Sequence, residues 1–141
     1  MSNINECIFC KIVNEEAKSW TVYEDKDVKA FFGINPASKG HTIIIPKKHY
    51  ENIIDIPENE LKKIIVVIKK LAKMYEKKLG LKEFNIMHAS GINAQQSVFH
   101  FHMHLVPREK EDGLDLWFKV KKEVVKDFDN LLKKIKLEEV K

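Results

Sequence analysis

Three histidines alternate with apolar residues in the run His100-Phe101-His102-Met103-His104. In a β-strand successive side chains point to opposite faces, so all three imidazoles would share one face while Phe101, Met103 and Leu105 face a core. Neighbouring rings would stand about 6.6 Å apart, because a strand rises roughly 3.3 Å per residue. Histidine can act as nucleophile, acid, base or metal ligand near neutral pH. The run therefore predicts a strand with a chemically active face.

Neither core packing nor a catalytic zinc accounts as well for this row of histidines. Core positions seldom use histidine, so packing alone rarely produces three at strict alternation. A catalytic zinc held by all three rings would need Zn–N distances of about 2.0–2.1 Å. Adjacent pairs could converge on an ion, but the outer two histidines start about 13 Å apart on a straight strand. Metal hydrolysis by the triad alone is therefore disfavoured.

The composition suits a single domain, residues 1–141. A chain of 141 residues with 44% hydrophobic content can bury its own core, and no repeat or linker divides it. The net charge is +4, and much of the lysine lies in 62–78 and 119–141, between apolar positions. This spacing is typical of solvated helix faces. Without an arginine-rich or aromatic-interleaved patch, it disfavours nucleic-acid binding.

The compartment is predicted from what the sequence lacks. Residues 1–6 do not have the basic and then apolar layout of a signal peptide, and no apolar run approaches about 18 residues. The only cysteines, Cys7 and Cys10, form a C-x-x-C pair that suits a metal or redox role better than a disulfide framework. We expect a cytoplasmic protein with no membrane partner.

The periodicity of apolar residues predicts an α+β fold with an antiparallel sheet of about five strands. Strands are expected at 22–24, 28–32, 40–46, 84–87 and 99–106, where β-branched and aromatic residues gather between turn signals. A central helix is expected over 57–79, with Asp55 or a neighbour as N-cap and Gly80 as its stop. A C-terminal helix should begin between Leu116 and Glu123. The domain would then comprise a core at about 7–107 and a helical extension at about 114–141. The apolar positions that define the central helix are Leu61, Ile64, Ile65, Ile68, Leu71, Ala72, Tyr75 and Leu79, and those of the C-terminal helix are Val120, Val124, Phe128, Leu131, Leu132 and Ile135.

Two blocks of the chain resemble the histidine triad (HIT) family. The first is Gly40–His49, which reads GHTIIIPKKH, and the second is Gln96–His104, which contains the alternating histidines. The similarity runs from Cys7 to about Pro107. It is to the small dimeric branch that hydrolyses or transfers nucleoside monophosphates, and it implies a homodimer whose subunits join their sheets.

The resemblance also implies roles for individual residues. His102 would attack the α-phosphorus of a purine nucleoside monophosphate conjugate and form a covalent nucleotidyl-imidazole, with His104 and His41 beside the phosphate. Without the resemblance, the apolar residues of the implied nucleotide site read as core and its polar ones as an ordinary loop. The implied nucleotide-binding residues are Ile8, Phe9, Ile12, Phe31, Gly33, Ile34, Asn35, Ala89, Gln95, Gln96, Ser97, His102 and His104.

The chain departs from the family pattern at two places. Gly33 stands where many relatives carry an acidic residue that binds the ribose hydroxyls, and Ala89 with Ser90 stands where relatives carry asparagines near the phosphate. Glycine supplies no acceptor, so ribose binding would be weaker or would pass to Asn35 or a backbone group. The substrate could therefore differ from the usual purine nucleotides.

The C-x-x-C pair is compatible with zinc. Some bacterial relatives carry zinc at matching positions, which implies a closed structural site of Cys7, Cys10, His49 and His100. The alternative is two buried thiols that only pack. A thioredoxin-like redox role is disfavoured, because that motif follows a strand and opens a helix, and this pair lies at the start of the chain.

Three functions remain open at this point. The first is a nucleoside phosphoramidase or dinucleoside polyphosphate hydrolase that acts through covalent His102. The second is a nucleotide-binding or scaffold protein that keeps the triad with little turnover, which Gly33 and Ala89 favour. The third, a zinc-dependent regulatory module, rests on the cysteines and His49.

Overall fold

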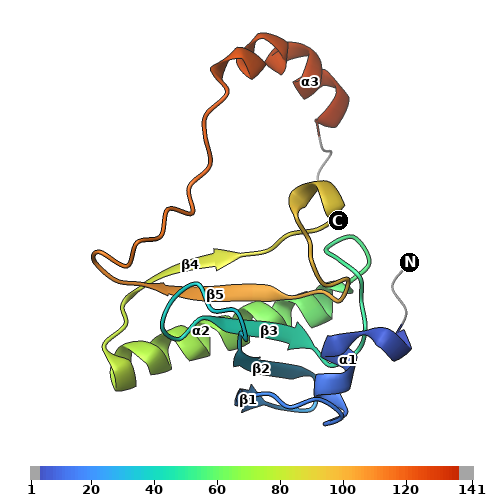
Figure 1. Ribbon diagram of the computed structural model, residues 1–141. Helices are drawn as coiled ribbons and strands as arrows, with labels where there is room; N and C mark the ends of the chain where they lie inside the picture. The colour runs from blue at the N-terminus through green and yellow to red at the C-terminus, as the bar shows by residue number, and fades with distance from the viewer. Residues whose placement is uncertain (1–3, 137–141) are drawn as a thin grey trace.

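A five-stranded antiparallel sheet lies against one long helix in the computed structural model, which describes residues 4–136 (Figure 1). The strand order is β1-β2-β3-β5-β4, so β1 and β4 are the edges. The sheet confirms the predicted fold class. Its strands are β1 (Thr21–Glu24), β2 (Val28–Phe32), β3 (Thr42–Pro46), β4 (Glu83–Met87) and β5 (Met103–Arg108); the helices are η1 (Ile4–Glu6), α1 (Ile8–Val13), α2 (Glu58–Leu79), η2 (Ile92–Ala94), η3 (Lys122–Asp127) and α3 (Phe128–Ile135).

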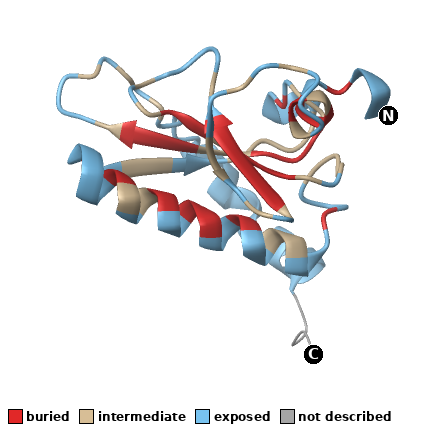
Figure 2. Ribbon diagram, turned by 90° about the horizontal axis from the view of Figure 1, so that it is seen from below, coloured by how far each residue is buried: buried red, intermediate tan, exposed pale blue. Residues whose placement is uncertain are grey.

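Helix α2 covers one face of the sheet and buries a single stripe of its residues (Figure 2). The buried positions are Ile64, Val67, Ile68, Leu71 and Tyr75. The sequence prediction included Ile65 and Leu79 in this stripe, which is wrong: both are exposed, and Val67 takes the inward position. Gly80 ends the helix as predicted, in the left-handed conformation with φ 70° that glycine adopts without strain.

The N-terminus of α2 differs from the prediction. Pro57 is the N-cap and provides no side-chain hydrogen bond. Asp55 instead accepts hydrogen bonds from the backbone N–H groups of Glu51 and Asn52, at 3.0 and 2.8 Å. Its carboxylate therefore stabilises the turn before the helix, because a short acidic side chain can satisfy loop donors as well as helix donors.

Strand β5 begins later than predicted, so His100 and His102 precede it. In the β3–β5 register, Ile44 lies opposite Met103, which would place Pro46 opposite Phe101. Proline has no N–H to donate, so the ladder stops there. The N–H of Phe101 instead donates to the carbonyl of Tyr50 at 2.6 Å. Phe101 and Leu105 are fully buried in the core and Met103 packs against it, as predicted.

Helix α1 packs on the other face of the sheet. Phe9, Cys10 and Ile12 form a second apolar cluster there with Phe31 and Ile45. Buried Lys29 ties this layer to β2, because its ammonium lies 3.1 Å from the carbonyl of Ile12 and 3.0 Å from Glu24. The face opposite α2 is thus only partly covered.

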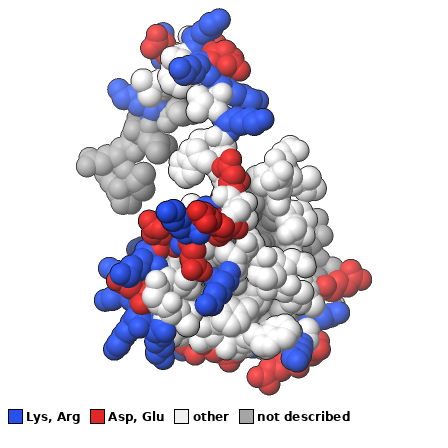
Figure 3. Space-filling view, turned by 60° about the vertical axis from the view of Figure 1, so that its left-hand side comes forward, with Lys and Arg blue, Asp and Glu red and all other residues white. Residues whose placement is uncertain are grey.

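The chain after β5 extends away from the sheet (Figure 1), and its lysines stand out on the surface (Figure 3). Arg108 fixes where this segment starts: it binds Asp112, the side-chain oxygen of Asn85 and the carbonyl of Leu114. A C-terminal helix was predicted to begin between Leu116 and Glu123. In the structure this region is a 3-10 helix, η3, followed by helix α3, and no residue of either is buried. The predicted extension to residue 141 continues outside the described residues. None of the helices within residues 4–136 is long and apolar enough to cross a membrane.

Candidate active site and metal centre

A cavity of about 270 Å³ opens on the partly covered face, between α1, the ends of β2 and β3, and residues 97–104, which carry the three alternating histidines and are called the triad segment. Its walls are mainly apolar, and the imidazoles of His41, His102 and His104 supply titratable groups, a combination common in small-molecule sites. Predicted site residues that line it are Ile8, Phe9, Ile12, Phe31, Gly33, Ile34, Asn35, His41, Ser97, His102 and His104. Sequence reasoning missed Lys18, Ser19, Trp20, Phe32, Ile43 and Val98.

One of the missed residues left a signal in the sequence. Trp20 is 54% exposed at the cavity wall, with the Lys18 ammonium 5.0 Å from its ring centroid. A tryptophan just outside a predicted strand is unusual for a solvated loop, because so large an apolar ring is seldom left exposed. It could have been named as a candidate on that ground.

Three predicted nucleotide ligands do not line the cavity: Ala89, Gln95 and Gln96. Gln96 is buried, and its amide holds a loop together: it accepts from Gly91 N–H and donates to the carbonyls of Glu51 and Val98. Gln95 has φ 69°, the left-handed conformation, at the end of η2. Contact of these three residues with a nucleotide stays a prediction.

The rings of His102 and His104 lie closer than a regular strand would place them. Their centroids are 5.0 Å apart, against the predicted spacing of about 6.6 Å, because His102 precedes β5. The edge of Phe9 packs against His102, with centroids 5.1 Å apart. The imidazoles of His102 and His104 therefore line the same part of the cavity.

Hydrogen bonds to backbone groups that can only accept or only donate fix the tautomers of these histidines. A carbonyl can only accept, so the 2.8 Å contact from His102 Nδ1 to the carbonyl of His100 places the proton on Nδ1. A backbone N–H can only donate, so Ala37 N–H, 2.9 Å from His41 Nδ1, leaves the proton of neutral His41 on Nε2. His41 Nε2–H then donates to His104 Nδ1 at 2.9 Å, and neutral His104 carries its proton on Nε2.

Burial keeps all three imidazoles neutral at pH 7. Desolvation lowers the pKa of His41 and of His102 from the usual value, and it lowers that of His104 to about 4, with smaller contributions from His102 and His41. The array thus combines a free lone pair on His102 Nε2 with an N–H donor on His104 Nε2. This pairs a nucleophile or base with a hydrogen-bond donor.

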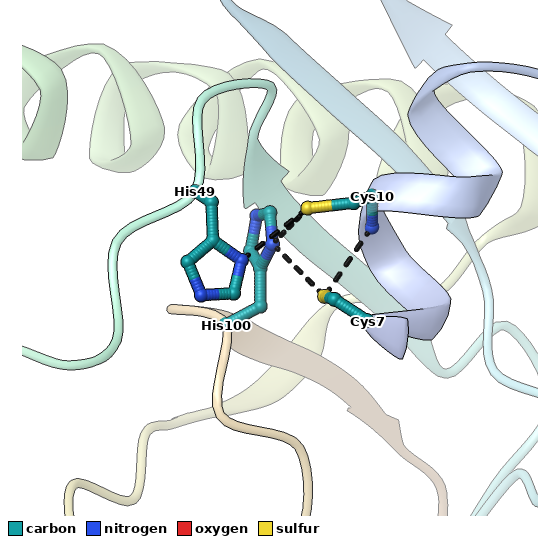
Figure 4. A group of neighbouring side chains, drawn as sticks. All are labelled: Cys7, Cys10, His49 and His100. Carbon is teal, nitrogen blue, oxygen red and sulfur yellow. Dashed lines mark hydrogen bonds between the residues drawn. The ribbon is translucent and has the colours of Figure 1, made fainter. Parts of the chain in front are cut away.

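A second cluster lies beside the triad segment, where Cys7, Cys10, His49 and His100 point toward one another (Figure 4). One ligand atom from each residue lies within 4.8 Å of all the others. The Sγ–Nδ1 distances are 3.4 Å for Cys7–His100, 3.3 Å for Cys10–His49 and 3.5 Å for Cys10–His100. A tetrahedral Zn²⁺ with two sulfur and two nitrogen ligands needs edges of roughly 3.3–3.8 Å. The donor set therefore fits zinc.

The surroundings of this cluster also suit a cation. His100 Nε2–H donates to the carbonyl of Pro46 at 2.8 Å, so its Nδ1 lone pair faces the thiols. Burial lowers the pKa of His100 to about 4 and, with the Cys7 thiol, raises that of Cys10 to about 12. A thiol that burial keeps protonated becomes a thiolate readily only beside a positive charge.

The fold and these two clusters define a small α+β protein with alternating histidines at an open pocket. Residues 14–111 match the family model described as HIT domain. The chain belongs to the HIT family.

Two relatives are similar to this chain over most of its length. An uncharacterized HIT-like protein of Methanocaldococcus jannaschii is 46% identical, covering 92% of this chain and 98% of that one. Adenosine 5′-monophosphoramidase HNT1 of Saccharomyces cerevisiae is 38% identical, covering 89% of this chain and 75% of that one.

Solved structures agree with the fold over nearly the whole chain. A Streptococcus mutans protein, SMU.412c, superposes with a TM-score of 0.86 and 36% identity, covering 95% of this chain and 85% of that one. A Zn-bound histidine triad family protein from Mycobacterium smegmatis gives a TM-score of 0.76 and 29% identity, covering 92% and 99%. Zinc thus occurs in a similar structure, and the cluster here has the ligands to bind it.

Proposed function

We propose that this protein is a nucleotidyl hydrolase or transferase that cleaves a phosphoramidate or phosphoanhydride bond at the α-phosphate of a nucleoside monophosphate conjugate. The observation that carries the proposal is the fixed tautomer of His102, whose Nδ1–H is bound to the carbonyl of His100. Its Nε2 lone pair is therefore available at the pocket, and burial keeps it unprotonated at neutral pH.

The proposed chemistry has two steps. His102 Nε2 forms a bond to the α-phosphorus while the bond to the leaving group breaks, and the leaving group takes the electron pair of that bond and, if it is an amine, a proton from solvent. The Nε2–H of His104 donates to a phosphate oxygen and stabilises the charge that develops there. Water then attacks phosphorus and gives up a proton to solvent, the P–Nε2 bond breaks with its electron pair returning to Nε2, and the nucleoside monophosphate leaves with neutral His102 restored. His41 holds His104 in the donating tautomer through their 2.9 Å hydrogen bond.

The similarity to a yeast adenosine 5′-monophosphoramidase makes adenosine monophosphoramidate the first substrate to test. We expect release of AMP and, after rapid acid-free quenching, a peptide carrying adenylyl on His102 by mass spectrometry. His102→Gly should give neither product nor adduct. Turnover in His102→Gly at the wild-type rate would refute the covalent mechanism.

Binding without efficient turnover is the second candidate function, and Gly33 favours it. The described residues that line the pocket include no carboxylate, so a bound ribose would lack an anionic acceptor there. Calorimetry with AMP and the amide assay separate the two candidates: tight AMP binding with no amide cleavage would support the second.

The Cys7, Cys10, His49 and His100 cluster is proposed as a closed structural zinc site. Four protein ligands leave no position for water, so a bound ion would serve as a cross-link rather than a Lewis acid. A bound ion would link α1 and the loop after β3, which carries His49, to His100 at the start of the histidine run. The proposed steps use this chain's own side chains and water, and none of them passes through the ion.

The open edge of the sheet supports a homodimer. Within residues 4–136 no strand pairs with the outer side of β4, and Ile65, Val66 and Ile86 beside it are 45–51% exposed along a shallow groove. An uncovered strand edge next to apolar surface favours pairing with another chain. We expect a solution mass about twice 16.5 kDa, and a lower mass for Ile86→Lys. A wild-type monomer at micromolar concentration would contradict the dimer.

A further inference from the structure

Five of the six histidines lie in the two clusters, and the sixth, His88, is the residue next after β4. It does not line the pocket, yet its hydrogen bonds lead to the triad. Its Nδ1 lies 2.8 Å from the carbonyl of His102, so Nδ1 carries the proton and donates. Its ring stacks on buried Phe101, with centroids 4.5 Å apart and planes at 29°.

The other side of the imidazole is fixed as well. With the proton on Nδ1, Nε2 accepts from the hydroxyl of Ser90. The Ser90 oxygen accepts in turn from the N–H of Ile53, at 3.0 Å. Every polar atom of this chain of bonds has a partner, so the ring is held in one orientation between the loop before α2 and the triad segment.

His88 supplies a bond that the sheet does not. In the β4–β5 register Met87 pairs with His104, so a longer β4 would bring Ala89 opposite His102. Strand β4 ends at Met87, and β5 begins only at Met103. The peptide of His102 therefore lies outside the ladder, and the imidazole N–H of His88 binds its carbonyl where a strand neighbour would otherwise do so.

From this arrangement we infer that His88 is a positioning residue, which holds the main chain of His102 so that the His102 ring meets a substrate at the correct angle. The inference rests on the proposed function. A nucleophile must lie close to its target with its lone pair aligned, and a displacement of about 1 Å can cost roughly a hundredfold in rate. The triad segment forms one wall of the pocket, but most of the lining comes from α1, β2, β3 and the loops beside them, so substrate binding should depend on His88 less than the rate of attack does.

Two amide variants test the inference as a matched pair. In His88→Asn, the side-chain NH₂ can take the place of Nδ1–H and still donate to the carbonyl of His102. In His88→Gln, the amide matches the position of Nε2 and reaches Ser90, but the donor to His102 is lost. Both variants lose the imidazole stack on Phe101, so their loss of thermal stability should be similar.

The measurement is the rate of adenylyl-enzyme formation and the KM with adenosine monophosphoramidate. We expect His88→Gln to form the adduct about tenfold more slowly with KM changed less than twofold, and His88→Asn to recover most of the rate. Equal loss in both variants, or a loss confined to KM, would overturn the inference. Its failure is distinct from failure of the proposed function, because in the latter case the wild type itself forms no adduct.

Discussion

His100 and His102 are two residues apart, yet opposite nitrogens hold their rings. His100 donates from Nε2 to the carbonyl of Pro46 and turns Nδ1 toward two thiols. His102 donates from Nδ1 to the carbonyl of His100 and keeps Nε2 free at the pocket. The same side chain thus becomes a candidate metal ligand in one place and a candidate nucleophile in the other. In each case the position of the accepting carbonyl oxygen, that of Pro46 or that of His100, decides the role, because it selects the tautomer.

The strongest test of this comparison removes each ring in turn. His102→Ala should lower turnover of adenosine monophosphoramidate at least about a thousandfold, because the covalent route is lost while the fold and metal content remain. His100→Ala should instead lose metal and thermal stability. Steady-state kinetics, metal analysis and thermal unfolding on both variants give the answer. Near-normal turnover in His102→Ala would end the nucleophile assignment, and unchanged metal content in His100→Ala would end the ligand assignment.

The sequence predicted the alternation of the three histidines but not the hydrogen bonds that give their rings different orientations. Alternation at His100, His102 and His104 correctly placed Phe101 and Leu105 in the core, since a period of two is visible in the residues themselves. The strand start at Met103 was not predictable from that pattern, because the ladder ends where Pro46, far away in sequence, would have to donate. Tautomers depend on carbonyl positions that exist only in the folded chain.

The residues of the candidate sites also divide into those that a local sequence motif reveals and those that only the folded structure brings together. Cys7 and Cys10 form a local motif, so their pairing was visible in the sequence, whereas the contact of His49 with Cys10 spans 39 positions and was reached only through family resemblance. His88 left no motif at all. It is a lone histidine at the end of a strand, and only its bond to the His102 carbonyl distinguishes it.

Removal of zinc tests the proposed role of His100 as a metal ligand. Purified protein should contain close to one zinc per chain, and Cys10→Ser or a chelator should release it. The expected cost is roughly 2–5 kcal/mol in unfolding free energy, comparable to loss of a native cross-link. Activity should fall only through a looser triad segment. Metal-free protein of full stability would show that the cysteines merely pack, and immediate loss of chemistry without unfolding would favour a metallohydrolase.

Acid should lower the unfolding free energy of the protein through His104. Its folded pKa is about 4 against an ordinary value of 6.5, because burial disfavours the charged ring. Below pH 6.5 the unfolded chain therefore binds a proton that the folded chain does not, and the unfolding free energy falls as pH drops toward 4. His104→Gln, which has no such proton, should reduce the loss between pH 7 and 5 by about 1–2 kcal/mol. Urea unfolding at each pH measures it, and identical slopes for the two proteins would show that His104 does not carry the effect.

The proposed substrate lies in the pocket and not at the cluster of Cys7, Cys10, His49 and His100, so a change on the pocket wall should leave that cluster untouched. Gly33 lines the pocket, and a Cβ there would lie 3.5 Å from Cδ1 of Ile43 and 4.0 Å from Nδ1 of His41, which is ordinary contact. Gly33→Asp should therefore fold and offer the ribose hydroxyls an anionic acceptor. A hydrogen bond to a charged group is worth about 1.5 kcal/mol or more, so the KM for adenosine monophosphoramidate should fall by roughly tenfold.

The matched substrate for Gly33→Asp is the 2′,3′-dideoxy analogue, which lacks both hydroxyls and should show no gain. Zinc content and melting temperature should equal those of the wild type, because no ligand of the Cys7–His100 cluster lines this wall. An equal gain with the dideoxy analogue would mean that the new carboxylate acts on the amine leaving group rather than on ribose. No gain with either substrate would mean that the ribose does not lie beside Gly33.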